Sequence, residues 1–257
     1  MARHSTVDWC EENYAYSSFI AEFWNTLSSL ALVYAGYRGW KIHSNLKGSG
    51  IYVILILVGV GSVFFHAILD VHSQMLDEIP MIFFVCQLFI NVLQLENRIG
   101  KIFAYLMASI SSYVVYSMAL LEGDPHDRKY VQHYSGVIDA INRIEFYVFQ
   151  SGIILSAIAI FIRLVYKVSR KPAARTLLYR GCSTFLLGWC CWLVDYFLCS
   201  QLQSTINPQF HAWWHVLSAI GTYQLALLSL VFANHNKELH YIEWEGFLRI
   251  LPTVTFC

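Results

Sequence analysis

Residues 51–69 read IYVILILVGVGSVFFHAIL and contain no Asp, Glu, Lys or Arg. The stretches 79–95, 102–121, 146–162 and 212–234 also lack these four residue types. A helix of about 20 apolar residues crosses a hydrocarbon core about 30 Å thick. Because lipid offers no hydrogen bonds to the backbone, uninterrupted apolar runs predict membrane-spanning helices and not the strands of a barrel.

The composition supports this interpretation. The 257 residues are 57% hydrophobic and 13% charged, whereas soluble domains are about 45–50% apolar and about 25% charged. These values exclude a disordered chain, a nucleic-acid-binding protein and an ordinary soluble enzyme. Two weaker apolar stretches, at 23–37 and 177–199, complete the pattern. We predict an all-α bundle of seven transmembrane helices, near residues 22–40, 51–69, 77–95, 101–121, 144–166, 177–199 and 211–233.

The chain divides into three regions. We expect residues 1–21 to form an acidic segment without the apolar core of a signal peptide, 22–233 to form the seven-helix bundle, and 234–257 to form a tail. Four of the seventeen Lys and Arg residues lie on the N-terminal side of the predicted spans. The positive-inside rule therefore predicts a luminal N-terminus and a cytosolic tail.

Three of the ten histidines lie inside predicted spans at the luminal side. His66 is near the end of the second span, and His211 and His215 begin the seventh on one helix face. Three imidazoles leave tetrahedral Zn²⁺ one open position, which is the catalytic pattern. We predict a zinc site there, with Asp77 as general base and Ser62 as a hydrogen-bond donor to the oxyanion. The alternative is that each histidine is a hydrogen-bonded packing residue.

The segment DWCEENY, residues 8–14, precedes the first span. Asp8, Glu11, Asn13 and the nearby Glu22 offer the hard oxygen ligands that suit Ca²⁺. The same residues also suit a solvated acidic cap on the first helix, which the helix dipole favours. Spacing alone does not decide between a calcium site and a cap.

The luminal end of the sixth span carries two further candidates. Asp195 is a candidate to orient a ligand imidazole by accepting its hydrogen bond. Cys199 lies on the same side as Cys10, in a compartment where disulfides form. We predict that these two cysteines pair; two free thiols are the alternative.

Several of these motifs occur together in one known family. The series DWCEENY, IAEFWNT, GSVFFH, QMLDEIPM, WLVDYFLC and QFHAWWH resembles the alkaline ceramidases, whose wider superfamily includes the adiponectin receptors. The resemblance extends from Asp8 to the end of the seventh span. One departure is the segment 122–143, which is longer than expected and which we expect to form a luminal helix over the bundle mouth.

The resemblance implies an intramembrane zinc amidase of the endoplasmic reticulum or Golgi that hydrolyses ceramide to a sphingoid base and a fatty acid. It implies no obligate protein partner and no nucleic acid. It places Zn²⁺ on the three histidines, with Asp77 and Ser62 completing the site, and it implies the Cys10–Cys199 disulfide. It also places Ca²⁺ on the side chains of Asp8, Glu11, Asn13 and Glu22 and on the backbone carbonyl of Trp9.

Two other functions remain open from the sequence. The first is a seven-helix lipid-sensing receptor in which zinc has a structural role. The second is a transporter that uses histidine and aspartate as a proton relay, although the chain shows no internal repeat of the kind common in transporters.

Overall fold

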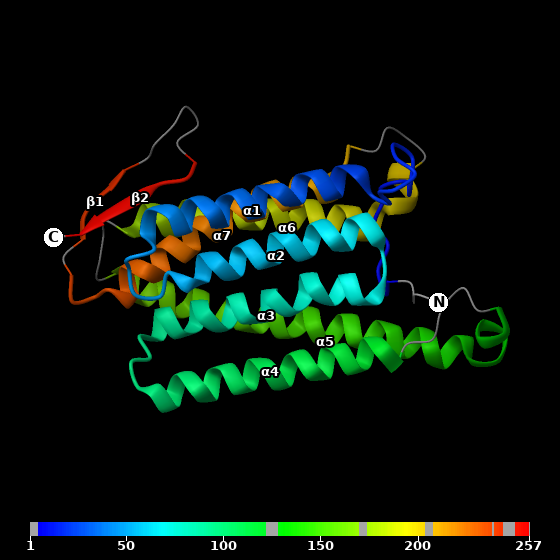
Figure 1. The fold of residues 1–257 in the computed structure, drawn as a ribbon, viewed down its shortest axis with the longest axis horizontal. Helices are drawn as coiled ribbons and strands as arrows, with labels where there is room; N and C mark the ends of the chain where they lie inside the picture. Colours follow the sequence, from blue (N-terminus) through cyan, green and yellow to red (C-terminus); the bar gives the residue numbers. More distant parts are fainter. Residues whose placement is uncertain are drawn as a thin grey trace.

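A computed structural model of the chain describes residues 5–121, 128–169, 174–203, 208–237, 239–243 and 250–256. These residues form seven helices: α1 (Phe23–His43), α2 (Gly50–Ile68), α3 (Val71–Leu93), α4 (Arg98–Leu121), α5 (Arg128–Ser169), α6 (Arg175–Gln203) and α7 (Phe210–Ala233). The helices lie side by side in one bundle (Figure 1). The largely buried α7 packs against α6, α1 and α3. The helical bundle predicted from the sequence is confirmed.

Six of the seven helices, α2 to α7, are long and apolar enough to cross a membrane. The predicted count of seven spans is not confirmed, because α1 does not reach the same hydropathy. The physical reason is a polar stripe at the start of α1, where Asn25, Ser28 and Ser29 recur at helical spacing. The Ser28 and Ser29 hydroxyls face α7 and α2, because they lie within hydrogen-bonding distance of His215 and Ser62, respectively.

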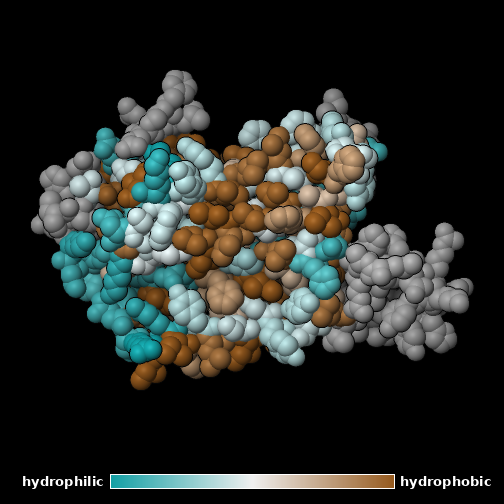
Figure 2. All heavy atoms as spheres, viewed as in Figure 1, coloured by the Kyte–Doolittle hydropathy of each residue, from teal (hydrophilic) through white to brown (hydrophobic). Residues whose placement is uncertain are grey.

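The outer surface of the bundle is apolar. Figure 2 shows hydrophobic atoms over the middle of the bundle and hydrophilic atoms gathered at its left end. Large side chains project outward from several helices, among them Leu57, Phe64, Phe103, Leu155 and Leu187. A soluble protein rarely exposes an apolar surface this extensive. The protein is an integral membrane protein.

Helix α5 differs from the prediction for residues 122–143. The expected separate luminal helix is not present, because residues 128–143 are the first part of the single 42-residue helix α5. Its beginning extends past the ends of the other helices (Figure 1). Residues 122–127 lie outside the described residues.

The tail is part of the bundle and not a separate appendage. Strands β1 (Leu239–Glu243) and β2 (Thr253–Phe256) pair antiparallel. Leu251 and Val254 are buried in the main hydrophobic core. The Tyr223 hydroxyl of α7 donates to the carbonyl of Pro252 at 2.8 Å. This end of the chain therefore closes the core at the end of the bundle where α7 finishes.

A close approach between α2 and α3 sets the position of Asp77. Pro80 lies inside α3 and lacks the amide that would bond the carbonyl of Leu76 four residues earlier. Gly61 of α2 packs against that carbonyl, and a Cβ added to Gly61 would lie 1.9 Å from the Leu76 oxygen and 2.8 Å from the Asp77 nitrogen. Only glycine allows the two backbones to come this close.

We expect Gly61→Ala to force α2 and α3 apart and to destabilise the protein by about 1–3 kcal/mol, the usual cost of overpacking. The measurement is the melting temperature of the purified protein in detergent. Gly152→Ala in α5 is the matched control, because a Cβ there meets no atom within 4 Å. An equal melting temperature for both variants would contradict the close approach.

Candidate functional site

Three imidazoles meet where the end of α2 lies beside the start of α7. His66 is in the last turn of α2, whereas His211 and His215 are in the first two turns of α7. The ring centroids are 5.0 Å apart for His66 and His211, 4.8 Å for His66 and His215, and 4.7 Å for the α7 pair. Among the described residues, this is the one group of His, Cys, Asp or Glu side chains with donor atoms all within 4.8 Å of one another.

The donor atoms of this cluster suit a metal ion. The buried nitrogens His66 Nε2 and His211 Nδ1 have no hydrogen-bond partner among the described residues. Leaving a buried polar group unpaired costs about 1–3 kcal/mol. A metal ion bound between the rings would satisfy both nitrogens. Imidazole is a common ligand of zinc and of other divalent transition metals.

Hydrogen bonds on the far side of two rings orient them towards this centre. His66 Nδ1 lies 2.5 Å from Glu22 Oε2. His215 Nδ1 lies 2.8 Å from the Ser28 hydroxyl and 3.3 Å from that of Ser29. Such outer partners hold the tautomer and direction of a metal-ligating ring. Each of these two rings therefore keeps its Nε2 for the metal.

Sequence reasoning did not find these outer partners. It assigned Glu22 to calcium alone and gave no role to Ser28 or Ser29. The signal that could have found the serines is the stripe Asn25, Ser28 and Ser29, which lies on one face of an otherwise apolar helix. Polar side chains in such a helix usually face a partner inside the bundle.

The other predicted site residues occupy different positions around the cluster. The Ser62 hydroxyl is buried 2.9 Å from that of Ser29. Asp77 is half-buried in α3, beside the Gly61 contact, and makes no side-chain hydrogen bond within the described part of the chain. Its carboxylate is not among the atoms of the tight histidine cluster.

Asp195 makes a contact that differs from the predicted one. Its carboxylate accepts the backbone amides of Cys10 at 3.1 Å and of His211 at 3.3 Å. It therefore holds the start of α7 and the N-terminal segment in place. Asp195 thus accepts a hydrogen bond from the backbone of His211, whereas the sequence predicted that it would accept one from a ligand imidazole ring.

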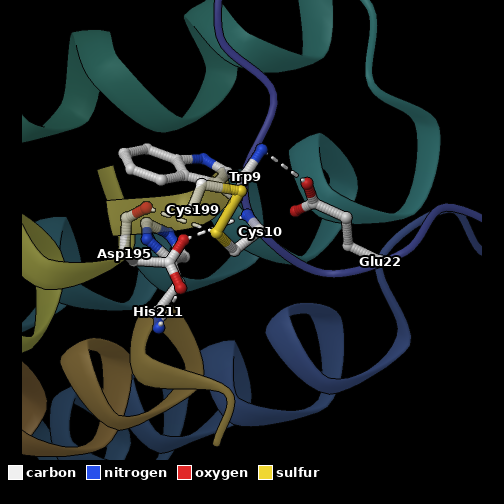
Figure 3. Close-up of a disulfide and its surroundings, with 6 residues drawn as sticks. All are labelled: Trp9, Cys10, Glu22, Asp195, Cys199 and His211. Atoms are coloured by element: carbon white, nitrogen blue, oxygen red, sulfur yellow. Dashed lines mark hydrogen bonds between the residues drawn. A yellow bond between two sulfur atoms is a disulfide. The ribbon is translucent and has the colours of Figure 1, made fainter. Parts of the chain in front are cut away.

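The N-terminal segment covers the cluster. Figure 3 shows Trp9, Cys10 and Cys199 close to His211 and Asp195. The Trp9 ring stacks on His211 with a centroid distance of 3.8 Å, and its backbone amide donates to Glu22 Oε1 at 3.1 Å. A disulfide between Cys10 and Cys199 connects this segment to α6. The segment is thus bonded to the same residues that surround the imidazoles.

The predicted calcium ligands lie along this segment. The Asn13 amide donates to both Asp8 oxygens, at 3.2 and 3.4 Å. The buried Glu11 carboxylate accepts the backbone amides of Trp24 at 2.7 Å and of Asn25 at 2.9 Å, as the capping alternative expects. Burial raises the pKa of Glu11, and the negative charge of Glu22 raises this pKa further. A cation beside these carboxylates would offset that repulsion.

Comparison with known proteins assigns this arrangement to a family. A family model described as ceramidase matches residues 1–255. The chain belongs to the ceramidase family. This confirms the resemblance seen in the motifs.

Individual relatives agree with the family assignment. The chain is 29% identical to alkaline ceramidase 3 of Mus musculus, over 98% of this chain and 88% of that protein. It is 30% identical to a putative alkaline ceramidase of Dictyostelium discoideum, over 90% and 88%. It is 29% identical to an alkaline ceramidase of Saccharomyces cerevisiae, over 96% and 84%. The similarity to these ceramidases therefore covers at least 90% of the chain.

We expect Glu22→Gln to weaken metal binding about 10–100-fold, because loss of a partner to a ligand imidazole typically has this effect. Affinity is measured by competition with a chelator, and metal content by elemental analysis of the purified protein. The exposed neighbour Glu12→Gln is the control and should bind as the unchanged protein does. Equal affinity in both variants would show that Glu22 does not support His66.

Proposed function

We propose that this protein hydrolyses the amide bond of ceramide, releasing a sphingoid base and a fatty acid, at a zinc ion held by His66, His211 and His215. The observation that carries the proposal is the buried group of three imidazoles, two of which have an unpaired nitrogen. The names of the relatives support ceramide as the substrate. A lipid amide also fits a protein whose surface is largely apolar.

The zinc ion, Asp77 and Ser62 have separate roles in this proposal. When bound, Zn²⁺ supplies a Lewis acid and makes hydroxide available near neutral pH. Asp77 takes a proton from the attacking water and delivers it to the leaving amine. The Ser62 hydroxyl donates to the carbonyl oxygen as negative charge develops on it. The half-buried carboxylate of Asp77 supports this assignment, because it forms no hydrogen bond with any described residue and is available to accept a proton.

We propose that ceramide enters laterally from the bilayer and that the N-terminus is luminal, in the endoplasmic reticulum or Golgi. The charge asymmetry along the chain supports this orientation. So does the disulfide of the N-terminal segment, because disulfides persist in oxidising compartments. The metal site would then lie towards the lumen and the tail towards the cytosol.

We expect Asp77→Asn to retain zinc and to lower kcat on a short-chain ceramide about 10²–10⁴-fold, the usual contribution of a general base. The measurement is release of sphingoid base by the purified protein, with metal content determined on the same sample. Glu243→Gln, an exposed carboxylate of β1, is the control and should keep full activity.

The same assay separates the two alternatives. Zinc-loaded protein that releases no sphingoid base from any ceramide would favour the receptor. Protein that contains no zinc and hydrolyses nothing would favour the transporter.

We also propose that Ca²⁺ binds to Asp8, Glu11, Asn13 and Glu22 and to the carbonyl of Trp9. Glu22 supports a link between this ion and the metal centre, because its two oxygens contact Trp9 and His66. Calcium bound to the segment would hold Glu22, and through it the His66 ring.

We expect Ca²⁺ at 100 times its dissociation constant to stabilise the protein by about 2.7 kcal/mol, and Glu11→Gln to reduce this effect. The measurement is the melting temperature across a calcium titration. Glu12→Gln should respond as the unchanged protein does, because its side chain is exposed. The proposed calcium site would be contradicted if neither the melting temperature nor the activity changed on addition of Ca²⁺ or of a chelator.

A further inference from the structure

A second polar site lies at the end of the bundle opposite the histidines. The loop before α2, the end of α3, the start of α4 and the end of α7 surround a cavity of about 220 Å³. Figure 1 places this end at the left, away from the N-terminal segment. Pockets for drug-sized ligands measure about 300–1,000 Å³, so this cavity has room for a small polar group and not for a whole lipid.

The walls of the cavity are a network of amides. Gln87 donates to the Asn91 oxygen at 2.7 Å, and Asn91 donates to the Ser229 hydroxyl of α7 at 3.1 Å. The Tyr105 hydroxyl of α4 donates to Gln87. Gly48 has a φ of +87°, and a Cβ there would lie 2.3 Å from the Asn91 oxygen. The wall is therefore closely packed, and its polar side chains are bonded to one another.

The charge within this cavity is positive. Two of the lining residues are Lys47 and Lys101, and none is an Asp or Glu. Lys47 lies 2.7 Å from Glu96, and Lys101 interacts electrostatically with the same carboxylate without forming an ion pair among the described residues. The Lys47–Glu96 pair is about half exposed, and exposed ion pairs contribute only about 0–1 kcal/mol. An anion in the cavity can therefore compete with Glu96 for Lys47.

We propose that this cavity binds a phosphate group, carried by the headgroup of an anionic lipid or free in solution. Basic pockets between transmembrane helices on the cytosolic side recognise such headgroups. Hydrophilic side chains gather at this end of the molecule (Figure 2). Ceramide itself carries no phosphate, so the site would serve a second ligand and not the substrate.

The test measures the melting temperature of the full-length protein in uncharged detergent. The probes are dioctanoyl phosphatidic acid, inorganic phosphate and, as an uncharged control, dioctanoylglycerol. We expect a phosphate-bearing probe to stabilise the protein in a saturable way. Lys101→Gln and Lys47→Gln should each weaken binding about fivefold, as expected for one lysine near an anionic headgroup.

Lys41→Gln is the matched control, because Lys41 lies in the last turn of α1 at the same end but does not line the cavity. It should bind like the unchanged protein. Stabilisation by phosphatidic acid alone assigns a lipid ligand, and stabilisation by both phosphate probes assigns the phosphate group itself.

Two results would overturn the proposal. One is no stabilisation by either phosphate probe; the other is equal stabilisation of the unchanged protein and the double variant Lys47→Gln/Lys101→Gln. Ceramide hydrolysis by the lysine variants shows that they fold. The melting assay does not depend on hydrolysis, so failure of this site and failure of the proposed function are distinguishable.

Discussion

The histidine cluster depends on the hydrogen bonds of one fully buried carboxylate, that of Glu22. A buried charge is stable only when it is paired and hydrogen-bonded. One Glu22 oxygen accepts the backbone amide of Trp9, and the other contacts His66 and the Asn25 side chain. Three elements of the site thus share the Glu22 carboxylate: the N-terminal segment, the first turn of α1 and the end of α2. Displacing any of them would leave part of that charge unpaired.

The N-terminal segment adds a second set of constraints. The disulfide joins Cys10 to the end of α6, and the Asp195 carboxylate of α6 accepts amides from both Cys10 and the start of α7. Trp9 packs flat on the His211 ring. The N-terminal segment, which lies outside the predicted spans, therefore helps to fix the positions of the helices that carry the imidazoles.

Polar side chains inside the bundle are arranged differently at its two ends. In the amide network, Gln87, Asn91 and Ser229 satisfy one another across α3 and α7. At the histidine cluster, two buried ring nitrogens have no hydrogen-bond partner in the part of the chain that the structure describes. Because an unpaired polar group in a membrane interior is costly, the first arrangement holds helices together around the basic cavity, and the second suits an ion bound directly by the rings.

Hydropathy and local spacing were sufficient to predict the helical bundle, the place of His66 near the end of its helix and the shared face of His211 and His215, because these properties depend on residues near one another in the chain. The span count was not settled in this way, since the polar stripe of α1 lowers the hydropathy of a helix that packs against α2 and α7. The motifs indicated the family, which the comparison confirms. They did not reveal which side chains orient the imidazoles.

The hydrogen bonds that orient the imidazoles were decided by the tertiary structure alone. Glu22 and His66 are 44 residues apart, and Ser28 and His215 are 187 apart, so no local pattern relates them. Asp195 illustrates the same limit, because its place in the sequence suggested an imidazole partner and the packing gave it a backbone amide. The sequence by itself predicted the three candidate ligands and the helices that carry them, since both depend on residue type and helical period. The pairing of buried polar atoms depended on how distant helices pack. A buried polar group must form its hydrogen bond with a partner that the fold brings close to it.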